Sequence, residues 1–318
     1  MSTVICKICS QEIKEDNLKH WWVDHKIKMA NYFIKYYDKK SLLTELPIEF
    51  KSISQYLLSD FNNKNELKKW LKLQTLEKQR EYLREILIKR RDLKELVWIP
   101  TQFEQRSSDN SVGISTYNKI FKEGYYNLCE SIGYKSRGFN NLTDKTILKS
   151  VRNLRNNPII TDTREQKRIK FRKVTEIGTM DVGDYTLKND NFGIVVDRKE
   201  LGDLINTMSA GFERFKRELI RAQESNNYII LLCESKISDF LSFNYLPWLS
   251  SKIQATPSFI AHRIKGLLQE FPLNFQVGFC DGRPHMKEVI MKIFEMEDYW
   301  KKTDIQLSLD LKLFIEGI

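Results

Sequence analysis

The sequence predicts an α/β domain with a central mixed sheet in its carboxyl-terminal half, preceded by a helical region and a small Cys/His module. Beyond Pro158, short apolar runs alternate with longer amphipathic runs, which is typical of strands covered by helices. Before Pro158 the apolar residues follow a helical period, and the first 40 residues hold a compact Cys/His pattern. We therefore expect three regions: the Cys/His module and a following helix at 1–40, the helical region at 41–157, and the α/β domain at 158–318.

The elements of the α/β domain follow from its periodicity and its turn residues. Apolar runs predict strands at 159–161, 171–177, 228–233 and 274–280. The Asn and Asp content of 188–191 predicts a hairpin that joins strands at 184–188 and 192–197. Helical patterns indicate helices at 200–225, 257–270 and 284–297.

The region from 41 to 157 carries a helical pattern that Pro100 ends. Leucines and Trp70 recur at helical spacing, and basic side chains share the same segment. The polar stretch 101–113 predicts a loop. Two further helices are expected at 115–121 and 125–132, with Gly133 as the C-cap of the second.

Charge favours a polyanionic partner. The chain has 52 Lys and Arg against 42 Asp and Glu, a net charge of +10, which suggests nucleic acid first and an anionic membrane surface second. A lysine-rich protein from an A/T-rich genome fits the same composition. No apolar run reaches the ~20 residues of a membrane span. Five cysteines, two of them in a Cys-x-x-Cys, indicate a reducing compartment, so we expect a cytoplasmic protein without a membrane partner.

The amino-terminal module has the ligand types of a zinc site. Cys6 and Cys9 are followed, after a spacer of ten residues, by His20 and His25. Two cysteines on a turn and two histidines about one helical turn apart suit tetrahedral Zn²⁺. The alternative is a reduced cysteine pair beside two surface histidines. Nearby basic side chains favour contact with DNA; they are Lys19, Lys26 and Lys28.

This pattern resembles a C2H2 zinc finger over about residues 4–26. The resemblance implies a structural Zn²⁺. The spacer of ten residues departs from the about twelve of common base-reading fingers, so the recognition helix would be shorter or shifted.

A second polar set lies where predicted strands begin and end. Asp197 and Lys199 alternate in one strand and therefore face the same side, while Asp184 follows Gly183 at the start of the neighbouring strand. Two carboxylates that bind Mg²⁺ and a lysine that orients or activates water are what a metal-dependent phosphodiesterase needs. The sequence therefore predicts a hydrolytic metal site in the α/β domain.

Four short motifs in this order resemble the XPF-type nuclease domain, a branch of the PD-(D/E)xK restriction-endonuclease-like fold, over about residues 157–300. They are Asp162-Thr163-Arg164-Glu165, Gly183-Asp184, Asp197-Arg198-Lys199 with Asp203, and Arg214 near a helix start. The resemblance implies a DNA endonuclease with such a fold.

The resemblance also implies roles for the acidic residues. Asp184, Asp197 and Glu165 would bind Mg²⁺ or Mn²⁺, and Asp162 would complete the catalytic acidic cluster. Asp203 would support the site by holding a basic side chain or a helix start. Asp197 stands where the family usually has glutamate, which keeps the charge but shortens the side chain by one methylene.

Basic residues complete the implied site. Lys199 would handle the attacking water, and Arg198 and Arg214 would stabilise the phosphate in the transition state. Arg164 would contact phosphate or DNA. The chain ends at Ile318, too soon after the domain for the tandem helix-hairpin-helix modules of many family members, so we expect DNA targeting to come from the finger and the helical region.

Targeting modules joined to a nuclease domain favour a phage or mobile-element enzyme of the homing type, in a bacterial or phage-infected cell. Residues 114–121 and 125–135 weakly resemble a helical repeat attached to phage homing endonucleases. A homodimer through the nuclease domain is also expected from the family. Two alternatives stay open: a structure-selective flap or junction nuclease in repair or recombination, and a catalytically inactive DNA-binding protein.

Overall fold

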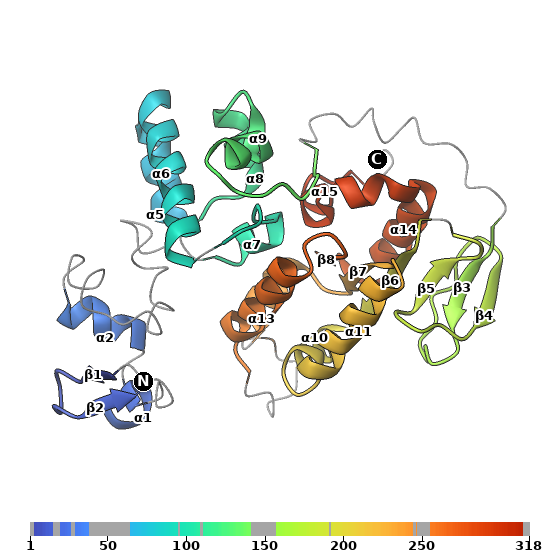
Figure 1. The fold of residues 1–318 in the computed structure, drawn as a ribbon, viewed down its shortest axis with the longest axis horizontal. Helices are drawn as coiled ribbons and strands as arrows, with labels where there is room; N and C mark the ends of the chain where they lie inside the picture. Colours follow the sequence, from blue (N-terminus) through green and yellow to red (C-terminus); the bar gives the residue numbers. More distant parts are fainter. Residues whose placement is uncertain are drawn as a thin grey trace. The chain divides into compact units, whose positions relative to one another are not determined.

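The computed structural model describes residues 3–14, 20–26, 29–37, 64–94, 96–108, 111–140, 157–190, 192–243, 246 and 255–313 (Figure 1). Lys19, Lys28 and the expected boundary at residue 40 lie outside these ranges. The chain divides into two compact units. One comprises 1–97, 108–124 and 131–134, and the other comprises 98–107, 125–130 and 135–318.

The amino-terminal module is a hairpin followed by two helices. Strands β1 (Thr3–Ile5) and β2 (Glu12–Lys14) pair antiparallel, and α1 (His20–His25) and α2 (Met29–Tyr36) follow. Its core contains three aromatic side chains, and the Trp21 ring lies 5.1 Å from the rings of both Tyr32 and Phe33. A core this small supplies little burial energy, so the module needs a further source of stability.

The expected helical pattern before Pro100 is confirmed as two helices. They are α5 (Lys64–Leu73) and α6 (Leu76–Lys94). Leu67, Leu71, Leu83 and Leu87 are buried, whereas Leu73 and Leu76, at the junction of the two helices, are exposed. The two later helices are also confirmed, as α8 (Ile114–Ile120) and α9 (Gly124–Ser131). Arg80 on α6 donates to the carbonyl oxygen of Ile120 over 3.0 Å, which ties α6 to the end of α8.

The predicted loop at 101–113 is wrong in part, because α7 (Gln102–Arg106) forms there. Thr101 and Glu104 make a reciprocal capping box, in which each side chain accepts a hydrogen bond from the backbone of the other. The buried ring of Phe103 stacks on Phe279, 5.6 Å away, in the core of the α/β domain.

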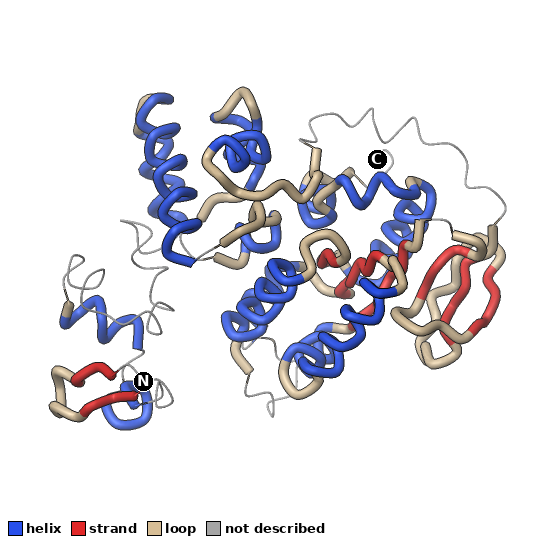
Figure 2. Tube along the Cα trace, viewed as in Figure 1, coloured by secondary structure: helices blue, strands red, loops and turns tan. Residues whose placement is uncertain are grey.

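The central sheet has six strands in the order β4-β3-β5-β6-β7-β8, drawn in red in Figure 2. Their bounds are β3 Ile159–Asp162, β4 Thr175–Gly178, β5 Tyr185–Leu187, β6 Ile194–Lys199, β7 Tyr228–Cys233 and β8 Phe275–Phe279. Strand β5 is antiparallel to both of its neighbours, whereas the other pairs are parallel. The expected mixed sheet is confirmed, including the β5–β6 hairpin.

Helices cover this sheet. They are α10 Leu201–Met208, α11 Phe212–Glu224, α12 Ile237–Leu241, α13 Pro257–Glu270, α14 Gly282–Glu295 and α15 Ile305–Asp310, with a 3₁₀ turn at Glu297–Lys302. Two expectations are wrong here. A break at Ser209–Gly211 divides the expected helix 200–225 into α10 and α11, and β4 begins at Thr175 rather than 171.

The alternation of side chains on β6 and β7 assigns them to two cores. Val195, Ile229 and Leu231 pack in the core that contains residues of α10, α11 and α13. Val196 and Ile230 face the other core, with residues of α14 and α15. Because both faces of the central strands are buried, β7 is apolar throughout, and each buried Ile or Leu contributes about 1.5–3 kcal/mol. No helix in the described ranges is long and apolar enough to cross a membrane.

Candidate active site and metal centre

A tight turn places Asp184 between strands β3 and β6. Gly183 has φ +68°, and a Cβ atom there would lie 2.3 Å from Cγ1 of Val195, so glycine is required at this position. The Asp184 amide donates to the carbonyl oxygen of Val196 over 2.9 Å, and its own carbonyl accepts from the Asp162 amide over 2.9 Å. The backbone thereby fixes the Asp184 carboxylate against β6.

Asp197 and Lys199 lie on the same face of β6, as their alternation predicts, and their side chains form an ion pair. Asp197 is only 1% exposed, and its Oδ2 atom has no hydrogen-bond partner among the residues that the structure describes. A buried carboxylate oxygen without a partner costs free energy, and a bound cation would remove that cost. The residues at this point therefore fit a divalent metal ion.

The electrostatics of Asp184 support the same fit. Its Oδ2 accepts the Arg198 amide over 2.8 Å. Burial, and then the neighbouring Asp197 carboxylate, raise the pKa of Asp184 to about 8. Burial alone would lower the pKa of Lys199, but Asp197 and Asp184 outweigh it and raise that pKa. The single positive charge of Lys199 does not neutralise the two neighbouring carboxylates of Asp184 and Asp197, and a divalent cation would do so.

Glu218 on α11 joins this group, and the sequence reasoning missed it. Its Oε1 accepts the Gly183 amide over 3.1 Å, so it holds the turn that presents Asp184. Burial and then the Asp197 charge raise its pKa, which places it within electrostatic reach of the site. One signal was available: Glu218 lies four residues after Arg214, and residues at that spacing share a helix face.

Arg198 points to the opposite face of β6. Its Nε lies 3.1 Å from Glu165 Oε2, and its Nη1 lies 3.0 Å from Glu234 Oε1, with the Arg198 and Glu165 side chains each 6% exposed. Burial would lower the pKa of Arg198, but the bonds to Glu165 outweigh it and raise that pKa. Glu165 and Arg198 thus pair with each other, and their predicted metal and phosphate contacts stay predictions.

Asp162 is also engaged within the protein. Its carboxylate accepts the backbone and side-chain N–H groups of Arg164 and the amide of Met180, at distances between 2.7 and 3.1 Å. Burial would raise the pKa of Asp162, yet these bonds lower it. Asp162 therefore orients Arg164, whose own side chain is 66% exposed.

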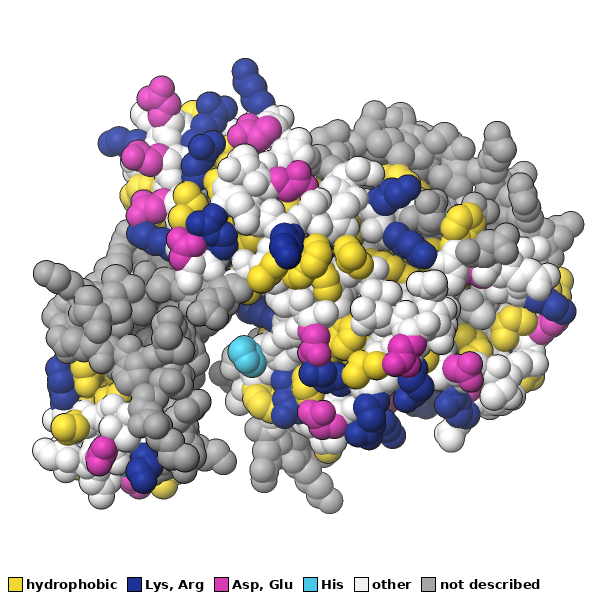
Figure 3. Space-filling model, in the orientation of Figure 1, with side chains coloured by type: hydrophobic (Ala, Val, Ile, Leu, Met, Phe, Trp, Pro, Cys, Tyr) yellow, Lys and Arg dark blue, Asp and Glu magenta, His cyan; other side chains and the backbone are white. Residues whose placement is uncertain are grey.

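Most of the predicted residues meet at one open pocket of about 680 Å³. Those in its lining are Arg164, Glu165, Asp184, Arg198, Lys199, Asp203 and Arg214, and the turn between α10 and α11 completes it. Asp162 and Asp197 are buried and absent from the lining. Basic and acidic side chains gather over α10 and α11 at the lower edge of Figure 3. A polar pocket with both signs of charge suits a phosphate ester together with a cation.

The match with a known family falls on the same stretch. Residues 161–265 match the ERCC4 domain. The match includes every predicted residue of the pocket lining, from Arg164 to Arg214, together with the buried Asp162 and Asp197. The resemblance noted in the sequence is therefore confirmed over this range and supports a DNA endonuclease. No curated protein sequence matches the chain.

Two solved structures are similar to parts of the chain. One is XPF from Aeropyrum pernix, which is 14% identical with a TM-score of 0.34. The match covers 43% of this chain and 65% of that chain. The other is XPF from Aeropyrum pernix in complex with DNA, also 14% identical with a TM-score of 0.34, covering 51% and 76%. The chain thus spans 65% of the length of the first of these structures.

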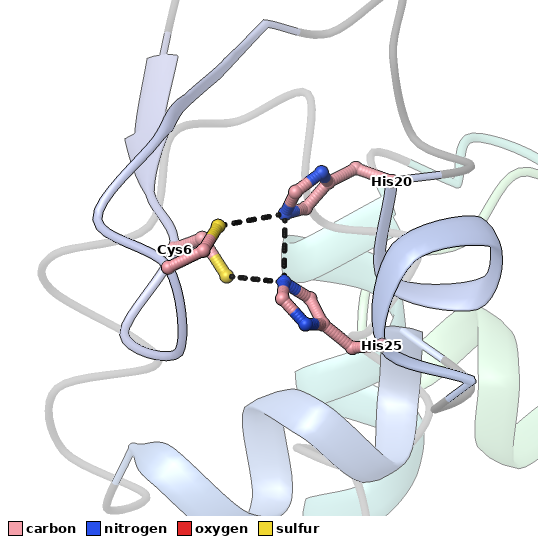
Figure 4. Close-up of side chains that lie close together, drawn as sticks. Cys6, His20 and His25 are labelled. Carbon is pink, nitrogen blue, oxygen red and sulfur yellow. Dashed lines mark hydrogen bonds between the residues drawn. The ribbon is translucent and has the colours of Figure 1, made fainter.

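The four residues predicted to bind zinc converge in the amino-terminal module. Cys6 Sγ lies 3.5 Å from His25 Nε2, Cys9 Sγ lies 3.4 Å from His20 Nε2, and the two Nε2 atoms are 3.2 Å apart (Figure 4). All four ligand atoms lie within 4.8 Å of one another. Tetrahedral zinc with ordinary bond lengths separates its ligand atoms by about 3.3–3.8 Å. The geometry is therefore consistent with a small zinc site.

Neighbouring groups prepare two of these ligands. Asp24 Oδ2 lies 2.6 Å from His20 Nδ1, which directs the proton to Nδ1 and leaves a lone pair on Nε2. Burial would raise the pKa of the Cys6 thiol, but the amides of Cys9 and Ile8 outweigh it and lower that pKa to about 6. Among the residues that the structure describes, this is the one group of three or more such ligands this close together.

Proposed function

We propose that residues 158–318 are a metal-dependent DNA endonuclease that hydrolyses phosphodiester bonds. The observation that carries the proposal is the unpartnered, buried Oδ2 of Asp197 beside Asp184, under a polar pocket within the ERCC4 match. Asp184 and Asp197 would hold Mg²⁺ or Mn²⁺, which when bound polarises the phosphate and lowers the pKa of water. Glu165 is the third proposed ligand, and using it requires its pair with Arg198 to open.

The remaining roles follow from the positions of the basic groups. Lys199 is held protonated by Asp184 and Asp197, so it would orient the attacking water and donate to an oxygen that gains charge. Arg164 and Arg214 line the pocket with exposed side chains and would bind phosphate oxygens. Asp203 lines the pocket beside them, and its proposed role is to hold a basic side chain.

The test of this site is loss of cleavage in two variants. Asp184→Asn and Lys199→Ala should each lower Mg²⁺-dependent cleavage of plasmid DNA by about 10²–10⁴-fold, the usual cost of removing a charge-stabilising or proton-handling group. Asp181→Asn is the matched control, because Asp181 is exposed in the same segment and does not line the pocket. Full activity in either site variant would reject the assignment.

The type of substrate is a separate proposal. The ERCC4 match favours a structure-selective nuclease that cuts flaps or junctions. The hypothesis of a homing endonuclease rests on the combination of a finger, a helical region and a nuclease domain, and it stays a prediction. A panel of branched DNAs compared with a linear genomic library distinguishes them, because a homing enzyme cuts one linear site and a junction nuclease follows branching. Binding without cleavage in Mg²⁺, Mn²⁺ and Co²⁺ would favour an inactive DNA-binding protein.

We also propose the division of labour within the chain. Residues 1–40 would form a zinc-stabilised finger and residues 41–157 a helical region, which together direct the nuclease domain to DNA. The expected homodimer through 158–318 is part of the same proposal, and sedimentation of the isolated protein with and without DNA measures it. A monomer in both states would contradict the dimer without affecting the catalytic site.

A further inference from the structure

A basic segment connects β3 to β4 beside the pocket. Residues 163–174 contain six Lys or Arg against one Glu, so this stretch carries half of the net charge of +10 of the chain. Its first part lines the pocket through Arg164 and Lys167. We use the term basic strip for three exposed side chains that follow, Arg168, Lys170 and Arg172. Neither the site assignments nor the family match gives these three residues a role.

The strip is held in place by the residues between its members. Ile169 is 5% exposed, and Phe171 packs on the same core, 5.4 Å from the ring of Tyr185. The Tyr185 hydroxyl also accepts the Ile169 amide over 3.1 Å. Alternate residues therefore point inward and anchor the backbone, while the three cations point to solvent. A merely solvated loop needs no such anchoring.

The charges of the strip are not neutralised within the described part of the chain. Arg168, Lys170 and Arg172 form no ion pair there, although Arg168 donates one hydrogen bond to the Thr163 carbonyl. Nearby carboxylates are already engaged: Glu165 pairs with Arg198, Glu176 with Lys188, and Glu200 with Lys167. Three like charges on one short segment repel one another, so the arrangement favours a polyanion over internal pairing.

We propose that the basic strip binds the sugar-phosphate backbone of the DNA substrate outside the scissile phosphate. The proposal rests on the nuclease function proposed for the pocket. Because the strip begins one residue after Lys167 in the pocket lining, a strand with one phosphate in the pocket continues onto it. Such contacts carry no sequence information, and they set the position and the salt dependence of binding.

The experiment measures binding of a 30-base-pair duplex by fluorescence anisotropy, in Ca²⁺, over a range of salt concentrations. The variant Arg168→Gln/Lys170→Gln/Arg172→Gln keeps Ile169 and Phe171, so we expect it to fold as the wild type. Its plot of log affinity against log salt should be less steep by about 3, since each phosphate contact contributes about 0.9. Affinity at about 0.1 M salt should fall about tenfold or more.

A matched control removes the same charge elsewhere in the α/β domain, outside the pocket lining, in Lys287→Gln/Lys301→Gln/Lys312→Gln, and it should keep the wild-type slope. A wild-type slope in the strip variant, or an equal change in the control, overturns the proposal. Lys170→Gln alone should reduce the slope by about 1, which decides the matter if the triple variant does not fold. Hydrolysis of bis(p-nitrophenyl) phosphate, which is too small to reach the strip, reports on the pocket separately and should be unchanged in the strip variant.

Discussion

At the level of single residues, charge pairing separates the two faces of β6. Asp197 and Lys199 pair with each other on one face, and Arg198 pairs with Glu165 and Glu234 on the other. The sequence analysis identified all of these residues except Glu234. It could not show which acid meets which base, because that depends on how β6 and the segment after β3 approach each other.

The crowded carboxylates predict a pH dependence of stability without metal. The pKa of Asp184 rises from an ordinary 3.8 to about 8 on folding, so the folded state binds the proton more tightly. This contribution is complete below about pH 4 and is lost as the pH rises through about 8. In EDTA, the melting temperature of the wild type should fall between pH 6 and 8, and the melting temperature of Asp184→Asn should fall less.

The comparison is made as a difference between the two proteins, since other groups titrate as well. Burial raises the pKa of Asp304 to about 6. Asp304 therefore changes the stability of both proteins equally, and mainly below about pH 6. Added Mg²⁺ should restore the melting temperature of the wild type at pH 8. Parallel pH profiles for the wild type and Asp184→Asn would show that Asp184 does not titrate in this way.

At the level of elements, periodicity predicted most of the fold, and local caps decided the rest. The apolar runs and the turn residues at 188–191 predicted β5, β6, β7 and β8 to within two residues at each end. The helix α7 was missed although Thr101 and Glu104 form a capping box, because the following polar residues dominated the pattern. The break before α11 was missed because the apolar spacing continues across Gly211.

Helix α11 gives the next prediction, through Glu218. Glu218→Gln keeps an oxygen that can accept the Gly183 amide, whereas Glu218→Leu removes it and leaves a buried donor unpaired at a cost of about 1–3 kcal/mol. We therefore expect Leu to lower kcat of DNA cleavage about tenfold or more relative to Gln. The kcat and KM of both variants, with a pH–rate profile, are the measurement.

A purely structural role for Glu218 would lower the melting temperature of the Leu variant and leave the pH profile of both variants unchanged. If Glu218 instead acts on the site through its charge, both variants should lower the Lys199 pKa, because the Glu218 charge helps to raise it. The basic limb of the profile should then move to lower pH. Glu213→Gln, an exposed change on the same helix, is the control.

At the level of the whole molecule, the two candidate metal sites belong to different compact units. The zinc ligands were predictable because four residues within twenty positions suffice, and local spacing alone defines them. The nuclease site draws on β3, β5, β6 and α11, so its composition depends on sheet order. The resemblance to a known domain grouped these residues in one site before the structure showed the sheet order.

Removal of zinc should unfold the amino-terminal module and spare the nuclease domain. The module has a core of few residues, and domains of this size generally need a metal or disulfides. In the presence of a zinc chelator, hydrogen exchange should therefore show a loss of protection in β1, β2, α1 and α2, with strands β6 and β7 unchanged. Cys6→Ser should show the same loss without chelator. Protection of the module that survives both treatments would mean that its aromatic core is sufficient.

Strand β6 also restricts how this chain can vary in length. Because its successive residues serve opposite faces, a shift of one position would turn Arg198 toward the Glu218 side and bury Asp197 and Lys199 among the acids that now hold Arg198. Insertions and deletions in the hairpin before β6 are thus expected to be excluded, whether by natural drift or by protein engineering. Length changes should be tolerated more readily at surface connections that do not set this register.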